Sequence, residues 1–158
     1  MKYWLLKSEP SVYSINDLER EQMTVWDGVR NYQARNFLRQ MRPGDMAFFY
    51  HSNAKPPGIA GLMRVTAANV VDPSQFDASS PYYDPKATEA SPRWQTVNVC
   101  HVETFSTYIP LASLKTTFTG DELLVVRRGN RLSVMPVAAV VAEKILRLAH
   151  SHQIVGQT

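Results

Sequence analysis

One segment, residues 26–41 (WDGVRNYQARNFLRQM), constrains the fold of this chain most, because both its start and its buried face follow from the residues. Gly28 marks a turn, and Asn31 stands where the side-chain oxygen of an N-cap accepts an amide hydrogen from the first helical turn. Apolar residues then recur as one stripe on a helix of about 3.6 residues per turn, at Ala34, Phe37, Leu38 and Met41. The segment therefore predicts an amphipathic helix that packs against a core.

Polar and aromatic residues surround the start of this predicted helix, namely Arg30, Tyr32 and Arg35. A purely structural helix has little need for an aromatic ring and two arginines around its first turn. A helix N-terminus with such neighbours is a favourable place for an anion or a polar heterocycle. The alternative is an ordinary surface helix with a capped start, and the segment by itself does not separate the two.

The composition is that of a globular chain without a disulfide framework. The 158 residues are 44% apolar and 20% charged, and no apolar run approaches the roughly 20 residues that span a bilayer. A single cysteine, Cys100, excludes an internal disulfide and a cysteine-based zinc cluster, and favours a reducing, cytoplasmic location. The net charge of +3 allows a polyanionic partner without requiring one.

Short apolar runs between turn signals predict a sheet. Val97 and Val99 alternate in one run, but Val102 breaks the register, which indicates a bulge or a strand buried on both faces. Residues 72–91 form the longest irregular region, and loops of this length inside compact domains are often functional. Strands are expected over five segments, residues 3–7, 46–51, 59–71, 96–105 and 131–136.

Two further helices are expected. Ser14 and Asp17 form a capping box that predicts a short helix, and an apolar stripe that begins at Val137 predicts a closing helix to about residue 150. Several short strands with helices and long loops favour an α+β fold, a small curved sheet or barrel with helices at its rim. We expect one domain over residues 1–150 and a frayed tail over residues 151–158.

The sequence holds no known catalytic motif. It has no G-x-S-x-G elbow, no P-loop and no G-x-G-x-x-G after a strand, and its four histidines are scattered, so neither a metal nor a cofactor is expected. The pair Arg127–Arg128 indicates a solvated turn, with phosphate contact as the alternative.

Several aromatic residues have polar neighbours. Trp26, Tyr50 and Trp94 are expected to face a pocket in which a planar base can stack, a contact of about 1–3 kcal/mol for an unstacked base. Other aromatic side chains have no such neighbours and are expected in the core, namely Trp4, Phe37, Phe48 and Phe49.

Eight motifs, in order along the chain, resemble those of the EVE domain family. The most specific is WDGVRNYQARNFLR at residues 26–39, and the others are WLLKSEP (4–10), FFYHS (48–52), PGIAGL (57–62), YYDP (82–85), PRW (92–94), IPL (109–111) and RLSVMPV (131–137). The resemblance implies a PUA-like fold, a small, strongly bent β-barrel with helices packed around it. It also implies that the chain binds nucleic acid, DNA or RNA, with a modified cytosine or adenine held in an aromatic-lined pocket and without catalysis.

The same resemblance implies roles for particular residues. Trp94 is expected as a further part of the aromatic cage, and Arg30 and Arg35 are expected to contact backbone phosphate. The base pocket is expected to be lined by eleven residues, Lys7, Ser8, Trp26, Asn31, Tyr32, Tyr50, His51, Ser52, Leu132, Ser133 and Met135.

Two alternatives remain beside the binding module. Some relatives with ASCH domains are amidohydrolases on modified nucleosides, and Lys7, Ser8 and Glu9 supply the residue types that such an enzyme uses. Successive residues of a strand point to opposite faces, so these three cannot converge from one strand alone. The third possibility is a partner-binding protein with a vestigial pocket. We expect a monomer that binds nucleic acid and no membrane.

Overall fold

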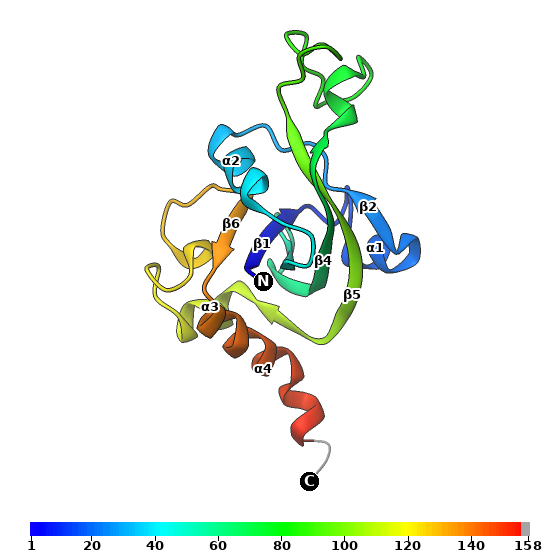
Figure 1. Ribbon diagram of the computed structural model, residues 1–158. Coiled ribbons are helices and arrows are strands. Elements are labelled where there is room, and N and C mark those ends of the chain that lie inside the picture. Colours follow the sequence, from blue (N-terminus) through cyan, green and yellow to red (C-terminus); the bar gives the residue numbers. More distant parts are fainter. Residues whose placement is uncertain (156–158) are drawn as a thin grey trace.

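The computed structural model describes the backbone of residues 1–155 and the side chains through residue 151. It contains a six-stranded mixed sheet in the order β2-β5-β4-β3-β1-β6 (Figure 1). The strands are β1 Tyr3–Ser8, β2 Met23–Val25, β3 Met46–His51, β4 Gly58–Val71, β5 Gln95–Pro110 and β6 Val134–Val137. Strands β1 and β3 are parallel, and the other pairs are antiparallel. The predicted α+β class is confirmed.

The sheet is bent but not closed. Its longest strands, β4 and β5, shift register at four points, and such irregularities bend and twist a strand pair. One shift falls where Leu62 pairs with Glu103 and Met63 pairs with His101, which leaves Val102 between them and confirms the predicted bulge. The edge strands β2 and β6 have three and four residues and pair with one neighbour each in the described chain. The bent barrel expected from the family is therefore present in an open form.

Helices cover both sides of this sheet (Figure 1). They are α1 Ile15–Glu21, α2 Tyr32–Gln40, α3 Leu111–Thr117 and α4 Ala139–Val155, with short 3-10 turns η1 Pro73–Phe76 and η2 Leu124–Val126. Both predicted helix caps, at Ser14 and at Asn31, are confirmed. The amide of Ser14 donates to Asp17 at 2.8 Å and the amide of Asp17 donates to the Ser14 hydroxyl at 3.1 Å. The side chain of Asn31 accepts from the amide of Ala34 at 2.9 Å.

Two boundaries differ clearly from the sequence prediction. The strand expected over residues 131–136 begins only at Val134, because residues 127–130 form a turn in which the Asn130 amide donates to the Arg127 carbonyl. Helix α4 continues past residue 150 to Val155, and the last three residues of the expected frayed tail lie outside the described residues. None of the helices in the described part of the chain combines the length and the apolar character needed to cross a bilayer.

Two apolar cores lie on the opposite faces of the sheet, because β1 and β3 alternate inward and outward residues. One core contains Leu5, Phe48, Tyr50 and Met135 and packs against α3 and α4 through residues such as Leu114 and Val141. The other contains Trp4, Leu6, Trp26 and Phe49 and packs against α1 and α2 through residues such as Leu18 and Leu38. Consecutive residues at the end of either strand therefore point to different sides of the molecule.

Candidate functional site

Three segments meet at the carboxyl end of β1. The parallel pairing of β1 with β3 sets Lys7 beside Tyr50 and Ser8 beside His51, and the Ser52 amide then donates to the Ser8 carbonyl at 3.0 Å. On the other side of β1 the Lys7 amide donates to the Ser133 carbonyl at 2.8 Å, just before β6. Six residues from the predicted pocket thus lie at one edge of the sheet, and we call this group the strand-end site: Lys7, Ser8, Tyr50, His51, Ser52 and Ser133.

Lys7 and Tyr50 lie on the α3–α4 face of this group. The Lys7 ammonium is 5.8 Å from the centroid of the Tyr50 ring, close enough for a cation–π contact. Burial lowers the pKa of Lys7. Burial, together with the neighbouring Tyr108, raises the pKa of Tyr50 to about 12, so the phenol stays neutral. Tyr50 itself is 3% exposed and belongs to the α3–α4 core, so the face offers a half-buried cation over a ring that is already packed. The predicted role of Tyr50 as an open pocket wall does not fit this packing.

Met135, also predicted to line the pocket, lies beneath this face as part of the core. Its side chain is fully buried, and its sulfur accepts a hydrogen bond from the side-chain nitrogen (Nδ2) of Asn130 at 3.8 Å. The predicted contact of Met135 with a ligand is therefore wrong in this structure. β6 alternates sides as β1 does, and Met135 falls on the inward position.

Ser8 and His51 point to the opposite face, where they hold the start of α1. The Ser8 hydroxyl donates to the Tyr13 carbonyl at 2.6 Å, and His51 Nε2 accepts from the Ile15 amide at 3.1 Å. Burial lowers the pKa of His51, in keeping with a neutral ring that accepts this bond. Both side chains therefore have a structural bond, and what they contribute to the strand-end site is mainly backbone.

Trp26 is a core residue rather than an open pocket wall. Its side chain is 6% exposed and meets the ring of Phe49 edge to face, with 5.3 Å between the centroids. Its amide donates to the Val97 carbonyl at 2.9 Å, and its carbonyl accepts from the Thr96 hydroxyl. The position thus joins the β2 end to β5, and only an edge of the indole reaches the surface.

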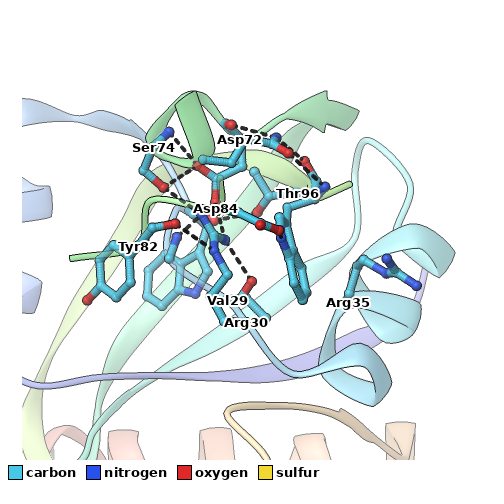
Figure 2. Close-up of polar contacts among 12 residues, drawn as sticks. Val29, Arg30, Arg35, Asp72, Ser74, Tyr82, Asp84 and Thr96 are labelled. Atoms are coloured by element: carbon cyan, nitrogen blue, oxygen red, sulfur yellow. Dashed lines mark hydrogen bonds and ion pairs between the residues drawn. The ribbon is translucent and has the colours of Figure 1, made fainter. Parts of the chain in front are cut away.

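Arg30 lies in a polar network that attaches the long loop of residues 72–94 to the segment before α2 (Figure 2). Its guanidinium donates to Asp72 at 3.0 Å, to the Ser74 hydroxyl at 3.0 Å and to the carbonyl of Tyr82 at 2.9 Å. Asp72 is 1% exposed and also accepts from the Gly28 amide at 2.9 Å. Because its donors are already bonded, the phosphate role predicted for Arg30 does not fit this geometry.

Arg35, Tyr32 and Trp94 form an aromatic stack beside the same network. Tyr32 lies over Trp94 with 5.2 Å between centroids, and the Arg35 guanidinium is 4.7 Å from the Tyr32 ring. Burial is the largest cause of a lowered pKa at Arg35, whose guanidinium also donates to the Arg93 carbonyl at 2.9 Å. The Trp94 indole is 6% exposed and donates to Asp84 at 2.8 Å.

This stack and the Arg30 network act together as a clamp, and we call it the α2 clamp: Arg30, Tyr32, Arg35, Asp72 and Trp94. Trp94 is covered by Tyr32 and by two arginines of the same chain, so its predicted cage role does not fit this packing. Arg35 packs against both rings and donates to the Arg93 carbonyl, which does not favour its predicted phosphate role. Tyr32 is 52% exposed, but it stacks on Trp94 and belongs to the clamp rather than to the strand-end site. Asp72 was not predicted as part of any site, because an Asp-Pro pair at the start of a loop indicates only a turn.

A cavity of about 430 Å³ lies on the other side of the α2 start. It is bounded by Asn31 and Gln33 from α2 and by the loop of residues 127–132. Asn31 and Leu132 were predicted to line a pocket, whereas Gln33 and three arginines were not assigned there, Arg127, Arg128 and Arg131. The Arg127–Arg128 pair was the one sequence feature that pointed to this cavity. The solvated turn predicted there is present, and its arginines lie beside the cavity.

The fold and these sites define a bent, open sheet with a polar edge at the β1 and β3 ends beside the start of an amphipathic helix. The EVE domain model matches residues 2–148, so the chain belongs to the EVE domain family, as its motifs indicated.

The chain is similar in sequence to one human and one bacterial protein, among others. Human thymocyte nuclear protein 1 is 44% identical over 164 residues, which cover 92% of this chain and 73% of the human protein. A Pseudomonas putida protein of known crystal structure is 50% identical, with a TM-score of 0.89 over 93% of this chain and 99% of its own.

The same human protein has been solved with DNA. The structure of human THYN1 protein in complex with 5-methylcytosine-containing DNA is 42% identical to this chain, with a TM-score of 0.86 over 94% of this chain and 98% of its own.

Proposed function

We propose that this protein binds DNA that carries a modified base, with 5-methylcytosine as the first candidate, and that it does so without catalysis. One observation carries the proposal. A relative that shares 42% of its residues and the same fold has been solved with 5-methylcytosine-containing DNA.

The strand-end site is the proposed place for the base. Lys7 offers a half-buried ammonium, and the partly buried side chains of Ser52 and Ser133 place two hydroxyl groups on the segments that pair with the end of β1. A base outside the helix presents its hydrogen-bonding edge to such groups. Burial of one methyl group contributes only about 0.8 kcal/mol, so these polar contacts and the shape of the site must supply much of the discrimination.

An amidohydrolase is supported less well by the same residues. The Ser8 hydroxyl already donates to the Tyr13 carbonyl, and the Lys7 ammonium lies on the opposite face beside Tyr50. A serine nucleophile needs a base within hydrogen-bond reach, and this pair does not have that arrangement. Glu9 is exposed and follows both residues in the chain. We therefore propose binding rather than hydrolysis.

The test is a binding titration at one moderate salt concentration against short duplex and single-stranded oligonucleotides of DNA and of RNA. Each carries cytosine, 5-methylcytosine, 5-hydroxymethylcytosine, adenine or N6-methyladenine at a single position. We expect tighter binding to DNA with 5-methylcytosine than to the same DNA with cytosine. Equal binding to all of them would overturn the proposal, and a preference for a methylated RNA would reassign the partner.

A pair of variants places the base at the strand-end site. Lys7→Met removes the ammonium and keeps an unbranched side chain, and loss of a charge-assisted hydrogen bond should weaken binding by about 1.5–3 kcal/mol. Lys86→Met makes the same charge change at an exposed position in the loop of residues 72–94, which projects from the sheet in Figure 1, and should leave the preference for the methylated base intact. If both variants lose affinity equally, Lys7 acts only through net charge.

A further inference from the structure

We propose that the loop of residues 127–132, which we call the arginine loop, binds the phosphodiester backbone of the strand whose modified base occupies the strand-end site. The inference rests on the proposed function and adds phosphate contacts at Arg128 and Arg131. These two residues replace Arg30 and Arg35, whose guanidiniums are held in the α2 clamp.

The arginine loop has a defined shape before any ligand binds. The Asn130 side chain donates to the Leu124 carbonyl at 2.6 Å and accepts from the Leu132 amide at 3.0 Å. Gly129, with a φ of +80°, completes the turn in a conformation that suits glycine. Because its backbone is held at both ends, the loop can present its arginines with little cost in ordering.

Two of the three arginines in this loop have free donors. Arg127 is paired with Asp121 at 2.9 Å. Arg128 and Arg131 are exposed and form no ion pair or hydrogen bond with any other residue whose side chain the structure describes. No acidic residue lines the cavity that they border. A planar guanidinium with five free donors is well suited to the oxygens of a phosphate.

The start of α2 faces the same cavity and favours the same charge. Asn31 and Gln33 line it, and the first turn of α2 holds no acidic residue. Asn31 caps the Ala34 amide, so the helix end combines a capped N-terminus with a positive dipole. Arginines and a helix N-terminus at one cavity make this a place for an anion rather than for an apolar ligand.

The cavity and the strand-end site are lined by neighbouring residues of the same segment. Leu132 lines the cavity, and the next residue, Ser133, accepts the Lys7 amide at 2.8 Å. A nucleotide whose base lay at Lys7 would therefore have its sugar and phosphates near the arginine loop. Because a phosphate site lies next in the chain to the proposed base site, the partner should be a nucleic-acid strand and not a free base.

The salt dependence of binding tests the assignment. A labelled DNA duplex with a single 5-methylcytosine is titrated over a range of salt concentrations with the wild type, Arg128→Gln and Arg131→Gln. Each lost phosphate contact should reduce the slope of log K against log [salt] by about 0.9 for a duplex, or about 0.7 if the bound DNA is single-stranded. Both side chains are exposed, so the melting temperatures should match that of the wild type.

Arg147→Gln is the matched control. It makes the same charge change at an exposed position in the middle of α4, a helix that extends away from α2 in Figure 1, and its slope should equal that of the wild type. Slopes of Arg128→Gln and Arg131→Gln that also equal the wild-type slope would overturn the inference, even if the preference for 5-methylcytosine persisted.

The two proposals fail in different ways. If the wild type does not prefer the methylated duplex, the proposed function fails. In that case reduced slopes of the two variants on unmethylated DNA would still support a phosphate contact at the arginine loop, and unchanged slopes would overturn that contact as well.

Discussion

Two regions flank the start of α2, and both contain arginines, yet they differ in whether those arginines are already bonded. In the α2 clamp, Arg30 donates to Asp72 and Ser74, and the buried carboxylate balances its charge. In the arginine loop, Arg128 and Arg131 have no partner among the side chains that the structure describes. Bonded arginines stabilise a fold, and free arginines beside a cavity remain available to a ligand. The same residue type is therefore bonded within the fold on one side of the α2 start and without such a bond on the other.

The largest effect is expected from Asp72→Ala in the α2 clamp. The change leaves the partly buried Arg30 without its ion pair and removes the acceptor of the Gly28 amide. Loss of one partner from a buried pair costs about 3–5 kcal/mol, so the free energy of unfolding measured in urea should fall by about that amount.

Asp121→Ala is the control, because Asp121 and Arg127 form an ion pair at the surface. It should leave the unfolding curve unchanged within error. Equal curves for Asp72→Ala and the wild type would show that the clamp does not stabilise the fold, and the comparison between the two regions would lose its basis.

Arg35→Ala should have an intermediate effect on stability and none on the salt dependence of binding. The change removes a guanidinium that lies against Tyr32 and Trp94, and such contacts contribute about 0.5–2 kcal/mol according to their burial. Urea unfolding measures the first quantity and titrations over a range of salt measure the second. A salt slope that fell in Arg35→Ala, and not in Arg128→Gln, would exchange the roles of the two regions.

The smallest effect concerns the pH dependence contributed by Lys7. Burial lowers the pKa of this ammonium in the folded state, so the folded protein releases the proton at a lower pH than the unfolded chain does. The unfolded state then binds more protons, and stability should rise as the pH passes from the folded pKa towards the ordinary lysine value. Lys7→Met should lack this rise.

The measurement is the difference in unfolding free energy between pH 8 and pH 9.5 for the wild type and for Lys7→Met. Tyr50 acts in the opposite direction, because its raised pKa of about 12 causes stability to fall once the unfolded tyrosine ionises near its ordinary value. The window therefore stops below that value. A steeper rise in Lys7→Met than in the wild type would contradict the assigned burial of Lys7.

Local patterns predicted much of the fold. The capping box at Ser14, the N-cap at Asn31 and the bulge at Val102 all depend on neighbours within a few residues, and all three are present. The strand at residues 46–51 was predicted at its observed bounds, since a run of apolar residues after a turn has few alternatives. The motifs indicated the EVE domain family, which matches residues 2–148.

The candidate site was predicted less completely. The ends of β1 and β3 were expected near one another, and the parallel pairing brings Lys7 and Tyr50 together. Four side chains expected at a ligand are buried instead, namely Trp26, Tyr50, Trp94 and Met135. Flanking polar residues do not reveal burial, because a polar neighbour of an aromatic side chain can bond to it or to distant backbone, as Asp84 does with the Trp94 indole.

The sequence by itself determined the elements, their caps and the family, because these depend on spacing and on hydrogen bonds between near neighbours in the chain. Only the tertiary structure decided which arginines are free. Arg30 and Asp72 are 42 residues apart, and no local pattern states that they meet. Long-range contacts bond the guanidinium of Arg30 in the α2 clamp, whereas Arg128 and Arg131 of the arginine loop have no such contact with the described side chains. This difference separates a structural cluster from a candidate binding surface.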